Sequence, residues 1–108
     1  MVVAHIILVK AKPETTEELA QEVLKDIAGL KDSLPNLVES VHLGVNFSPR
    51  SRGYTHGFTM IFKDRAALDQ YGTAPEHVKI VNERIRPHFD DTLAFDYDVA
   101  EYSNPRLH

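Results

Sequence analysis

The sequence contains no cysteine among its 108 residues. This absence excludes a disulfide scaffold, a thiolate nucleophile and a zinc site with cysteine ligands, and it suits a reducing compartment. No apolar run approaches the ~20 residues that a membrane-spanning helix needs, and the apolar start of the chain lacks the basic region and cleavage pattern of a signal peptide. We therefore expect a soluble, cytoplasmic protein that has no membrane partner.

Basic residues are also too scattered to form a nucleic-acid-binding face. The formal net charge is −4, and only Arg50 and Arg52 cluster, in a short loop-like stretch. Because a nucleic-acid-binding protein needs a basic surface to neutralise phosphates, we expect no nucleic-acid partner. Phosphate-binding and serine-hydrolase motifs are absent. The only local group of metal-ligand residue types lacks a metal-site spacing, so we assign it to a solvated loop (His88, Asp90 and Asp91).

The composition that remains is that of one small globular domain. Hydrophobic residues make up 43% of the chain and charged residues 26%, and the length suits a single domain. We place this domain at residues 1–100 and assign no structure to a tail at residues 101–108. A chain of this length buries only about two-thirds of the surface of its unfolded state. Further burial through self-association would therefore stabilise it.

Hydrophobic periodicity predicts the first half of the fold. Residues 2–9 are apolar on both parities, as in a strand that is buried on both faces. Pro13 and the capping box Thr15-x-x-Glu18 predict the start of a helix that closes around residues 29–35. Its apolar residues recur at helical spacing (Leu19, Val23, Leu24, Ile27 and Leu30).

The middle of the chain alternates with a period of two. Residues 37–47 and 54–62 therefore predict two strands, joined by a loop at residues 48–53 as an antiparallel hairpin. The first strand has an apolar face (Val41, Leu43, Val45 and Phe47), and the second places four residues on one face (His56, Phe58, Met60 and Phe62).

Two short helices and a strand are predicted for the last third of the chain. Asp64 is the expected N-cap of a helix at residues 65–71, which Gly72 and Thr73 interrupt. A second helix begins at Pro75 and ends at Pro87. Helical spacing predicts an apolar stripe on this second helix (Val78, Val81 and Ile85). Alternation predicts a final strand at residues 92–99 with one apolar face (Leu93, Phe95, Tyr97 and Val99).

This order of elements predicts an α+β domain of ferredoxin-like βαββαβ topology. Such a domain has a four-stranded antiparallel sheet with both helices on one side. The second face of the sheet would then carry more apolar side chains than a surface in water tolerates, and an exposed apolar face usually marks an interface. We therefore expect a homodimer that packs sheet to sheet.

Four segments, taken together and in order, resemble the stress-responsive dimeric A/B barrel (Dabb) family. They are residues 5–10 (HIILVK), 53–62 (GYTHGFTMIF), 68–77 (LDQYGTAPEH) and 95–97 (FDY). The resemblance implies a homodimer in which two ferredoxin-like sheets form one barrel, with a cavity between sheet and helices in each subunit. It implies no cofactor.

The resemblance also implies a site. One characterised plant member of the family closes a linear polyketide by intramolecular aldol condensation. Its catalytic pair resembles Tyr71 and His77, and its pocket histidines resemble His5 and His56. The present sequence differs at Ala74, where that member has a further histidine.

The chemistry of Tyr71 and His77 suits such a reaction. An imidazole titrates at about pH 6.5, so near neutrality His77 can remove a proton next to a carbonyl and return it. The enolate formed needs a hydrogen-bond donor, and a tyrosine hydroxyl can donate without ionising. We therefore predict a small-molecule pocket and, at that pocket, a cofactor-independent cyclase or lyase that acts on a small carbonyl or polyketide compound.

A purely structural interpretation stays open for each residue. Tyr71 can simply end its helix with its ring in the core, and His77 can be a hydrogen-bonded residue at a helix start. His5 and His56 lie in apolar strands and need polar partners; Asp96 is the candidate for His5, as an ordinary core pair or as a substrate-binding unit. The alternative function is a non-catalytic stress-response or ligand-binding protein whose main property is a stable oligomer.

Overall fold

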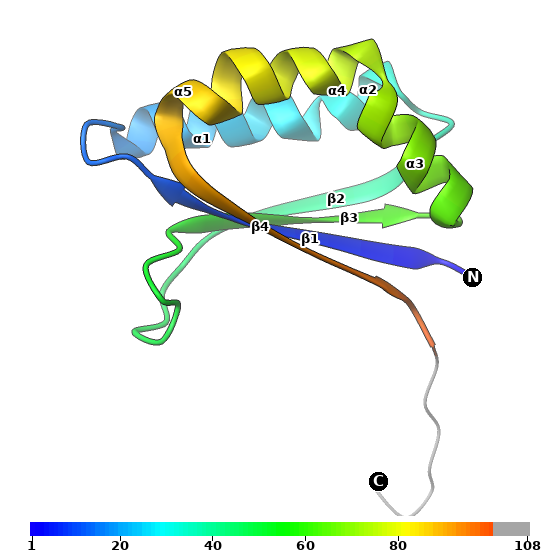
Figure 1. The fold of residues 1–108 in the computed structure, drawn as a ribbon, viewed down its shortest axis with the longest axis horizontal. Coiled ribbons are helices and arrows are strands. Elements are labelled where there is room, and N and C mark those ends of the chain that lie inside the picture. The colour runs from blue at the N-terminus through cyan, green and yellow to red at the C-terminus, as the bar shows by residue number, and fades with distance from the viewer. Residues whose placement is uncertain (101–108) are drawn as a thin grey trace, which may run out of the picture.

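The computed structural model describes residues 1–100 as a four-stranded antiparallel sheet with helices on one side (Figure 1). The strands are β1 (Val3–Ala11), β2 (Val38–Val45), β3 (His56–Phe62) and β4 (Phe89–Asp98), in the order β2-β3-β1-β4. This is the ferredoxin-like α+β topology that the sequence predicts, and that prediction is confirmed. The expected tail lies outside the described residues.

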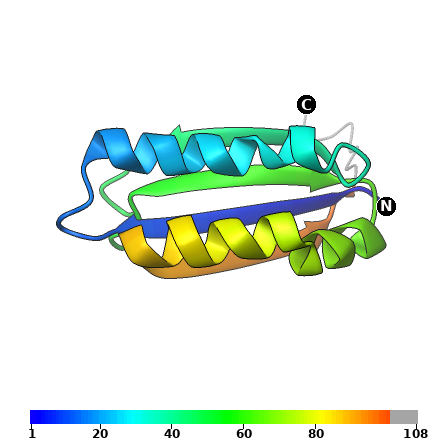
Figure 2. The same ribbon diagram turned by 90° about the horizontal axis from the view of Figure 1, so that it is seen from above.

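The helices form one layer that covers the sheet. The first crossover holds α1 (Glu17–Ala28) and α2 (Leu30–Ser33). The second holds α3 (Arg65–Thr73), α4 (Pro75–Ile80), the π-helical η1 (Val81–Ile85) and α5 (Arg86–His88). Seen from above, α1 runs over the side of β2 and β3, and the second group runs over the side of β1 and β4 (Figure 2). No helix within residues 1–100 is both long and apolar enough to cross a membrane.

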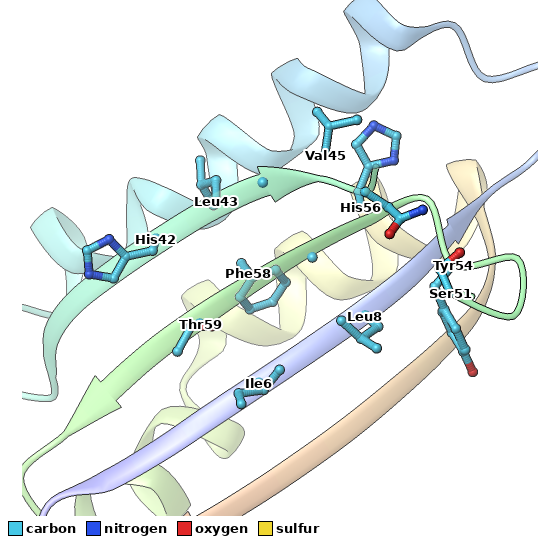
Figure 3. Close-up of a pocket in the computed structure, with 13 residues that line it drawn as sticks. Ile6, Leu8, His42, Leu43, Val45, Ser51, Tyr54, His56, Phe58 and Thr59 are labelled. Atoms are coloured by element: carbon cyan, nitrogen blue, oxygen red, sulfur yellow. The ribbon is translucent and has the colours of Figure 1, made fainter. Parts of the chain in front are cut away.

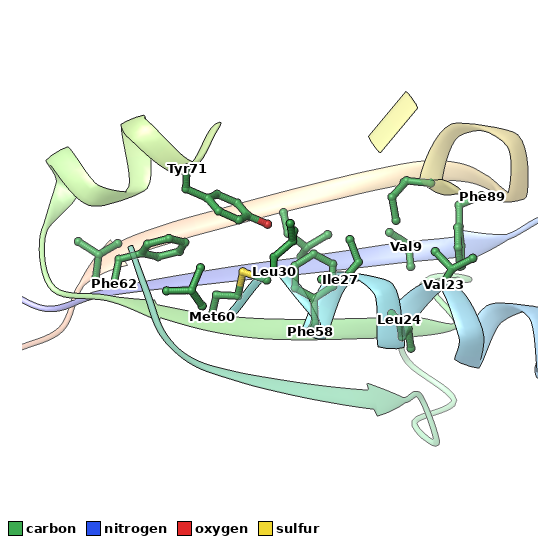
Figure 4. Close-up of a cluster of buried hydrophobic side chains, with 14 of the residues drawn as sticks. Val9, Val23, Leu24, Ile27, Leu30, Phe58, Met60, Phe62, Tyr71 and Phe89 are labelled. Atoms are coloured by element: carbon green, nitrogen blue, oxygen red, sulfur yellow. The ribbon is translucent and has the colours of Figure 1, made fainter. Parts of the chain in front are cut away.

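The hydrophobic core fills the space between the sheet and the helices (Figure 4). It draws on α1 and α2, α3 and alternate residues of β1 and β3 (among them Val9, Val23, Leu24, Ile27, Leu30, Phe58, Met60, Phe62, Tyr71 and Phe89). The predicted inward face of β3 is confirmed, because all four of its residues are buried. On the edge strand β2, Leu43 and Val45 share the helix side but remain exposed.

The side of the sheet without helices is called here the open face. It carries the strand residues that alternate with those of the core. Side chains at paired positions of neighbouring strands share a face, so Ile6 lies beside Phe95 and Leu8 beside Leu93. Leu93, Phe95 and Tyr97 are exposed there. The second, apolar face that the sequence predicts is therefore present, and its large side chains stand over β1 and β4.

Helix α3 begins as predicted, whereas α1 begins one residue later than predicted. Asp64 accepts a hydrogen bond from the backbone N–H of Ala67 at 2.8 Å and so caps α3. For α1, the prediction that Thr15 is the N-cap is wrong. Thr16 accepts from the N–H of Leu19 at 3.1 Å, while the Thr15 hydroxyl donates to the carbonyl of His88 at 2.7 Å. A contact distant in sequence thus takes the side chain that local spacing assigned to the cap.

The predicted break between α3 and α4 is displaced. Helix α3 continues through Gly72 to Thr73, and the chain becomes extended at Ala74 (φ −62°, ψ 133°). Since Pro75 disfavours the helical conformation of the residue before it, Ala74 is where the helix must stop. The predicted apolar stripe is also partly wrong: Val78 is exposed, while Ile85 is buried.

The end of the second crossover differs from the prediction because of its backbone hydrogen bonds. In η1 the N–H of Arg86 bonds to the carbonyl of Val81, five residues back, which changes the phase of the stripe. The helix ends at His88, one residue beyond the predicted end at Pro87. Strand β4 then starts at Phe89, because β1 is long enough to pair with it, so Asp90 and Asp91 belong to β4 and the predicted solvated loop is wrong.

Candidate functional site

Four of the five predicted site residues gather at one end of the layer between sheet and helices. Tyr71 comes from α3, His77 from α4, His5 from β1 and Asp96 from β4. The rings of Tyr71 and His77 lie 4.4 Å apart between centroids, and those of Tyr71 and His5 lie 6.0 Å apart. His5 Nδ1 contacts a carboxylate oxygen of Asp96. We call these four residues the Tyr71 cluster.

His77 is held in a defined tautomer. Its Nδ1 lies 3.1 Å from the carbonyl oxygen of Gly72, which can only accept, so Nδ1 carries the proton and donates it. The Nε2 lone pair is then left for a substrate. Burial lowers the pKa of this half-buried imidazole, and repulsion from His5, whenever that ring is protonated, adds to the shift, while the Gly72 contact opposes it. His77 is therefore neutral at physiological pH, which is the form that acts as a base.

Tyr71 has the opposite character. Its side chain is only 2% exposed, and burial raises the pKa of its phenol. The hydroxyl therefore keeps its proton across the physiological range and is a donor that does not ionise. Figure 4 shows this hydroxyl directed along the layer between sheet and helices. A neutral base and a protonated donor thus lie side by side.

The contact between His5 and Asp96 is the one that the sequence suggested. These residues are cross-strand partners on the helix side of β1 and β4. The Nδ1–H of His5 donates to Asp96, which orients the ring, and the ring packs edge-on against Phe62 with centroids 6.0 Å apart. Asp96 itself is part of the lining of a hollow of about 430 Å³ between α3 and the end of β4, together with Arg65 and Asp69.

His56, the fifth predicted residue, does not join the Tyr71 cluster. It lies at the first position of β3, whereas His5 pairs with Met60 farther along. Its Nε2–H donates to a carboxylate oxygen of Glu17 at 2.8 Å, and its Nδ1 lies 2.7 Å from the Thr55 hydroxyl. Sequence reasoning missed Glu17, because no spacing pattern links the first turn of a helix to a strand 39 positions later.

Two hollows beside predicted site residues leave out Tyr71 and His77. A hollow of about 450 Å³ lies on the open face over β2 and β3 (Figure 3). Neither Tyr71 nor His77 lines it, nor the hollow beside Asp96. Within residues 1–100, no group of three or more His, Asp or Glu side chains is placed to hold a metal ion.

Comparison with known proteins identifies the domain and its relatives. The family model described as "Stress responsive A/B Barrel Domain" matches residues 3–99. A stress-response A/B barrel domain-containing protein of Arabidopsis thaliana is 28% identical over 102 residues, which cover 94% of this chain and 38% of the relative. This chain thus spans less than half the length of that plant protein. Olivetolic acid cyclase of Cannabis sativa is 29% identical over 99 residues, covering 90% of this chain and 96% of the cyclase.

Solved structures agree with the fold. The Arabidopsis thaliana protein At3g17210 superposes with a TM-score of 0.85 at 27% identity, covering 94% of this chain and 99% of that one. A ferredoxin-like protein from Jannaschia sp. CCS1, described as dimeric, has a TM-score of 0.75 at 27% identity and covers 92% and 100%. Hydroxynitrile lyase from Passiflora edulis has a TM-score of 0.84 at 19% identity over 95% and 97%, a likeness of fold alone.

Proposed function

The chain belongs to the Stress responsive A/B Barrel Domain family, and we propose that it is a cofactor-independent lyase or cyclase acting on a small carbonyl compound. In this proposal His77 is the base and Tyr71 is the hydrogen-bond donor. The similarity to olivetolic acid cyclase, over nearly the full length of both chains, supports aldol-type closure as the reaction class.

The observation that carries the proposal is the pairing of Tyr71 with a tautomer-fixed His77. Nε2 of His77 removes a proton from the carbon beside a carbonyl, and the electron pair of that C–H bond becomes an enolate. The Tyr71 hydroxyl donates to the enolate oxygen. The enolate carbon then attacks a second carbonyl carbon of the same molecule. The alkoxide that forms takes the proton back from His77, so the enzyme ends in its starting state.

His5 and Asp96 are the substrate-binding part of the proposal. With Nδ1–H engaged by Asp96, His5 keeps Nε2 as an acceptor for an enol or hydroxyl group of the substrate. In this proposal the substrate reaches the Tyr71 cluster through the hollow beside Asp96. His77 of α4 lies against Tyr71, so the proposal requires α4 to move before a substrate can reach the Tyr71 hydroxyl. A substrate contact by His56 stays a prediction, and its bonds to Glu17 and Thr55 favour a structural role.

The test is turnover of linear poly-β-ketone compounds by the wild type and two variants. We expect His77→Ala to lower kcat/KM by roughly 10²–10⁴-fold, because it removes the base. We expect Tyr71→Phe to lower it by roughly 10²-fold while leaving substrate binding nearly unchanged, because one enolate donor is lost.

The matched control is His88→Gln, which changes a histidine at the far end of the same crossover. It should retain the activity of the wild type. Equal rates for the wild type, His77→Ala and Tyr71→Phe would refute the assigned roles.

One observation favours the alternative of a non-catalytic, ligand-binding or stress-response oligomer. Tyr71 is almost fully buried, and core side chains fill the space between sheet and helices around it. A dimer that turns over none of these substrates, and in which Tyr71→Phe changes only stability, would support that alternative. Under both functions we propose a homodimer that packs through the open face, which the dimeric relative from Jannaschia supports.

A further inference from the structure

The Tyr71 hydroxyl is a buried polar group that the chain itself does not use. Its side chain is 2% exposed, and burial alone raises the pKa of the phenol, with no hydrogen bond contributing. Within residues 1–100, every side-chain nitrogen and oxygen that is sealed from solvent has a hydrogen-bond partner. The Tyr71 hydroxyl has none among these residues, so it still reaches solvent and is free to donate to a molecule that enters from outside.

Four fixed charges line the route by which a substrate reaches this hydroxyl in the proposal above. The hollow of about 430 Å³ between α3 and the end of β4 is bordered by Arg65, Asp69, Asp96 and Asp98. Both elements lie at the same end of the sheet (Figure 1). Three carboxylates and one guanidinium therefore set the electrostatic potential that an entering molecule meets.

The one cation among these four charges is already bound. Nε of Arg65 donates to a carboxylate oxygen of Asp98 at 3.1 Å, and a second guanidinium nitrogen donates to the other oxygen. Arg65 is the first residue of α3, where a positive charge opposes the helix dipole. The two-bond contact with Asp98, which joins α3 to β4, accounts for an arginine at this position.

The charge that remains along the hollow is negative. Asp69 forms no ion pair within residues 1–100, and Asp96 accepts its hydrogen bond from His5, which is a neutral ring in the proposed function. Farther in, a substrate finds one donor, the Tyr71 hydroxyl, and two acceptors, the Nε2 atoms of His5 and His77. None of these three groups is a cation that could bind a carboxylate.

We propose that the substrate is a linear poly-β-ketone without a negative charge, and that Asp69 and Asp96 exclude its anionic counterparts. This inference rests on the proposed function and adds the charge of the substrate.

The hydrogen-bonding groups suit an uncharged compound of this class. A β-diketone in its enol form offers one hydroxyl, which can donate to an imidazole nitrogen, and one carbonyl, which can accept from Tyr71. A carboxylate in the hollow would lose water without gaining a cation. It would also be repelled, since two like charges about 6 Å apart in water weaken binding roughly threefold.

The test uses two compounds that differ only in the charge of one end. One is a linear poly-β-ketone whose alkyl end carries a methyl ester, and the other carries a free carboxylate at that end. We take the ratio of their kcat/KM values for each variant, because any loss of folded protein cancels in this ratio. At about 0.1 M salt we expect the wild type to favour the ester roughly tenfold, and about 1 M salt should reduce that preference.

A charge series at one exposed position separates electrostatics from shape. We expect Asp69→Asn to lower the ratio about threefold and Asp69→Lys to lower it about tenfold, because the charge at this position goes from −1 to 0 and to +1. Asp90→Asn is the matched control, since it removes a carboxylate at the opposite end of β4. Its ratio should equal that of the wild type, because the distance exceeds the screening length.

A wild type that favours the carboxylate would overturn the inference, because Arg65 would then bind the anion. So would a ratio that is the same for the wild type, Asp69→Asn and Asp69→Lys, and either result would leave the proposed function standing. If neither compound is turned over, the proposed function fails, and the dissociation constants of the two compounds decide the inference. We expect the ester to bind more tightly; equal constants, or no binding of either compound, would overturn it.

Discussion

At the scale of single residues, burial moves the pKa values of His77 and Tyr71 in opposite directions. It disfavours the charged form of each group, so it lowers the pKa of the imidazole and raises that of the phenol. One physical cause thus produces a neutral base beside a protonated donor. The sequence predicted these two residues and their roles, but the carbonyl of Gly72, which fixes the tautomer of His77, belongs to the backbone and leaves no mark in a sequence pattern.

The lowered pKa of His77 makes a prediction about stability. Between the folded pKa and about 6.5, the unfolded chain binds more protons than the folded chain. This contribution to the free energy of unfolding is therefore fully present above pH 6.5 and is lost as the pH falls toward the folded pKa. We expect His77→Gln to flatten that decline in urea titrations between pH 7.5 and pH 5, at one protein concentration. Parallel profiles for the two chains would show that His77 titrates alike in the folded and unfolded states.

At the scale of elements, local signals located most of the helices and strands. The N-cap Asp64, the period of β3 and the hairpin were all predictable, because each depends on residues close in sequence. Three details depended on distant partners instead. Thr15 bonds to His88, β4 lengthens because β1 offers it partners, and the π-helical turn shifts the phase of the apolar stripe.

The cap of α3 can be tested directly. We expect Asp64→Ala to lower the free energy of unfolding by about 1 kcal/mol, because the Ala67 N–H loses its acceptor. Asp69→Ala is a matched change at an exposed position of the same helix, and it should alter stability by less than about 0.5 kcal/mol. Urea denaturation at pH 7.5 measures both. Equal effects of the two variants would contradict the capping role.

At the scale of the whole molecule, the open face is the apolar surface that a single chain leaves in contact with water. Its exposed aromatic and aliphatic side chains over β1 and β4 stand on the opposite side from the helices. Association removes this surface from water, and the gain of roughly 25 cal/mol for each Å² of apolar area is large for a chain with a thin core.

We therefore expect sedimentation at micromolar concentration to yield a particle of twice the 12.2 kDa mass of the chain. We also expect the midpoint of thermal unfolding to rise with protein concentration, because dissociation and unfolding are linked. A midpoint that is independent of concentration, together with a particle of 12.2 kDa, would mean that the open face stays in contact with water.

The topology and the inward face of β3 followed from the sequence, because periodicity and capping are properties of neighbouring residues. The family resemblance supplied the roles of Tyr71 and His77. The folded chain was needed to separate His56 from His5 and to pair His56 with Glu17. These depend on strand register and on which way each face turns, and both are settled by contacts between segments far apart in the chain.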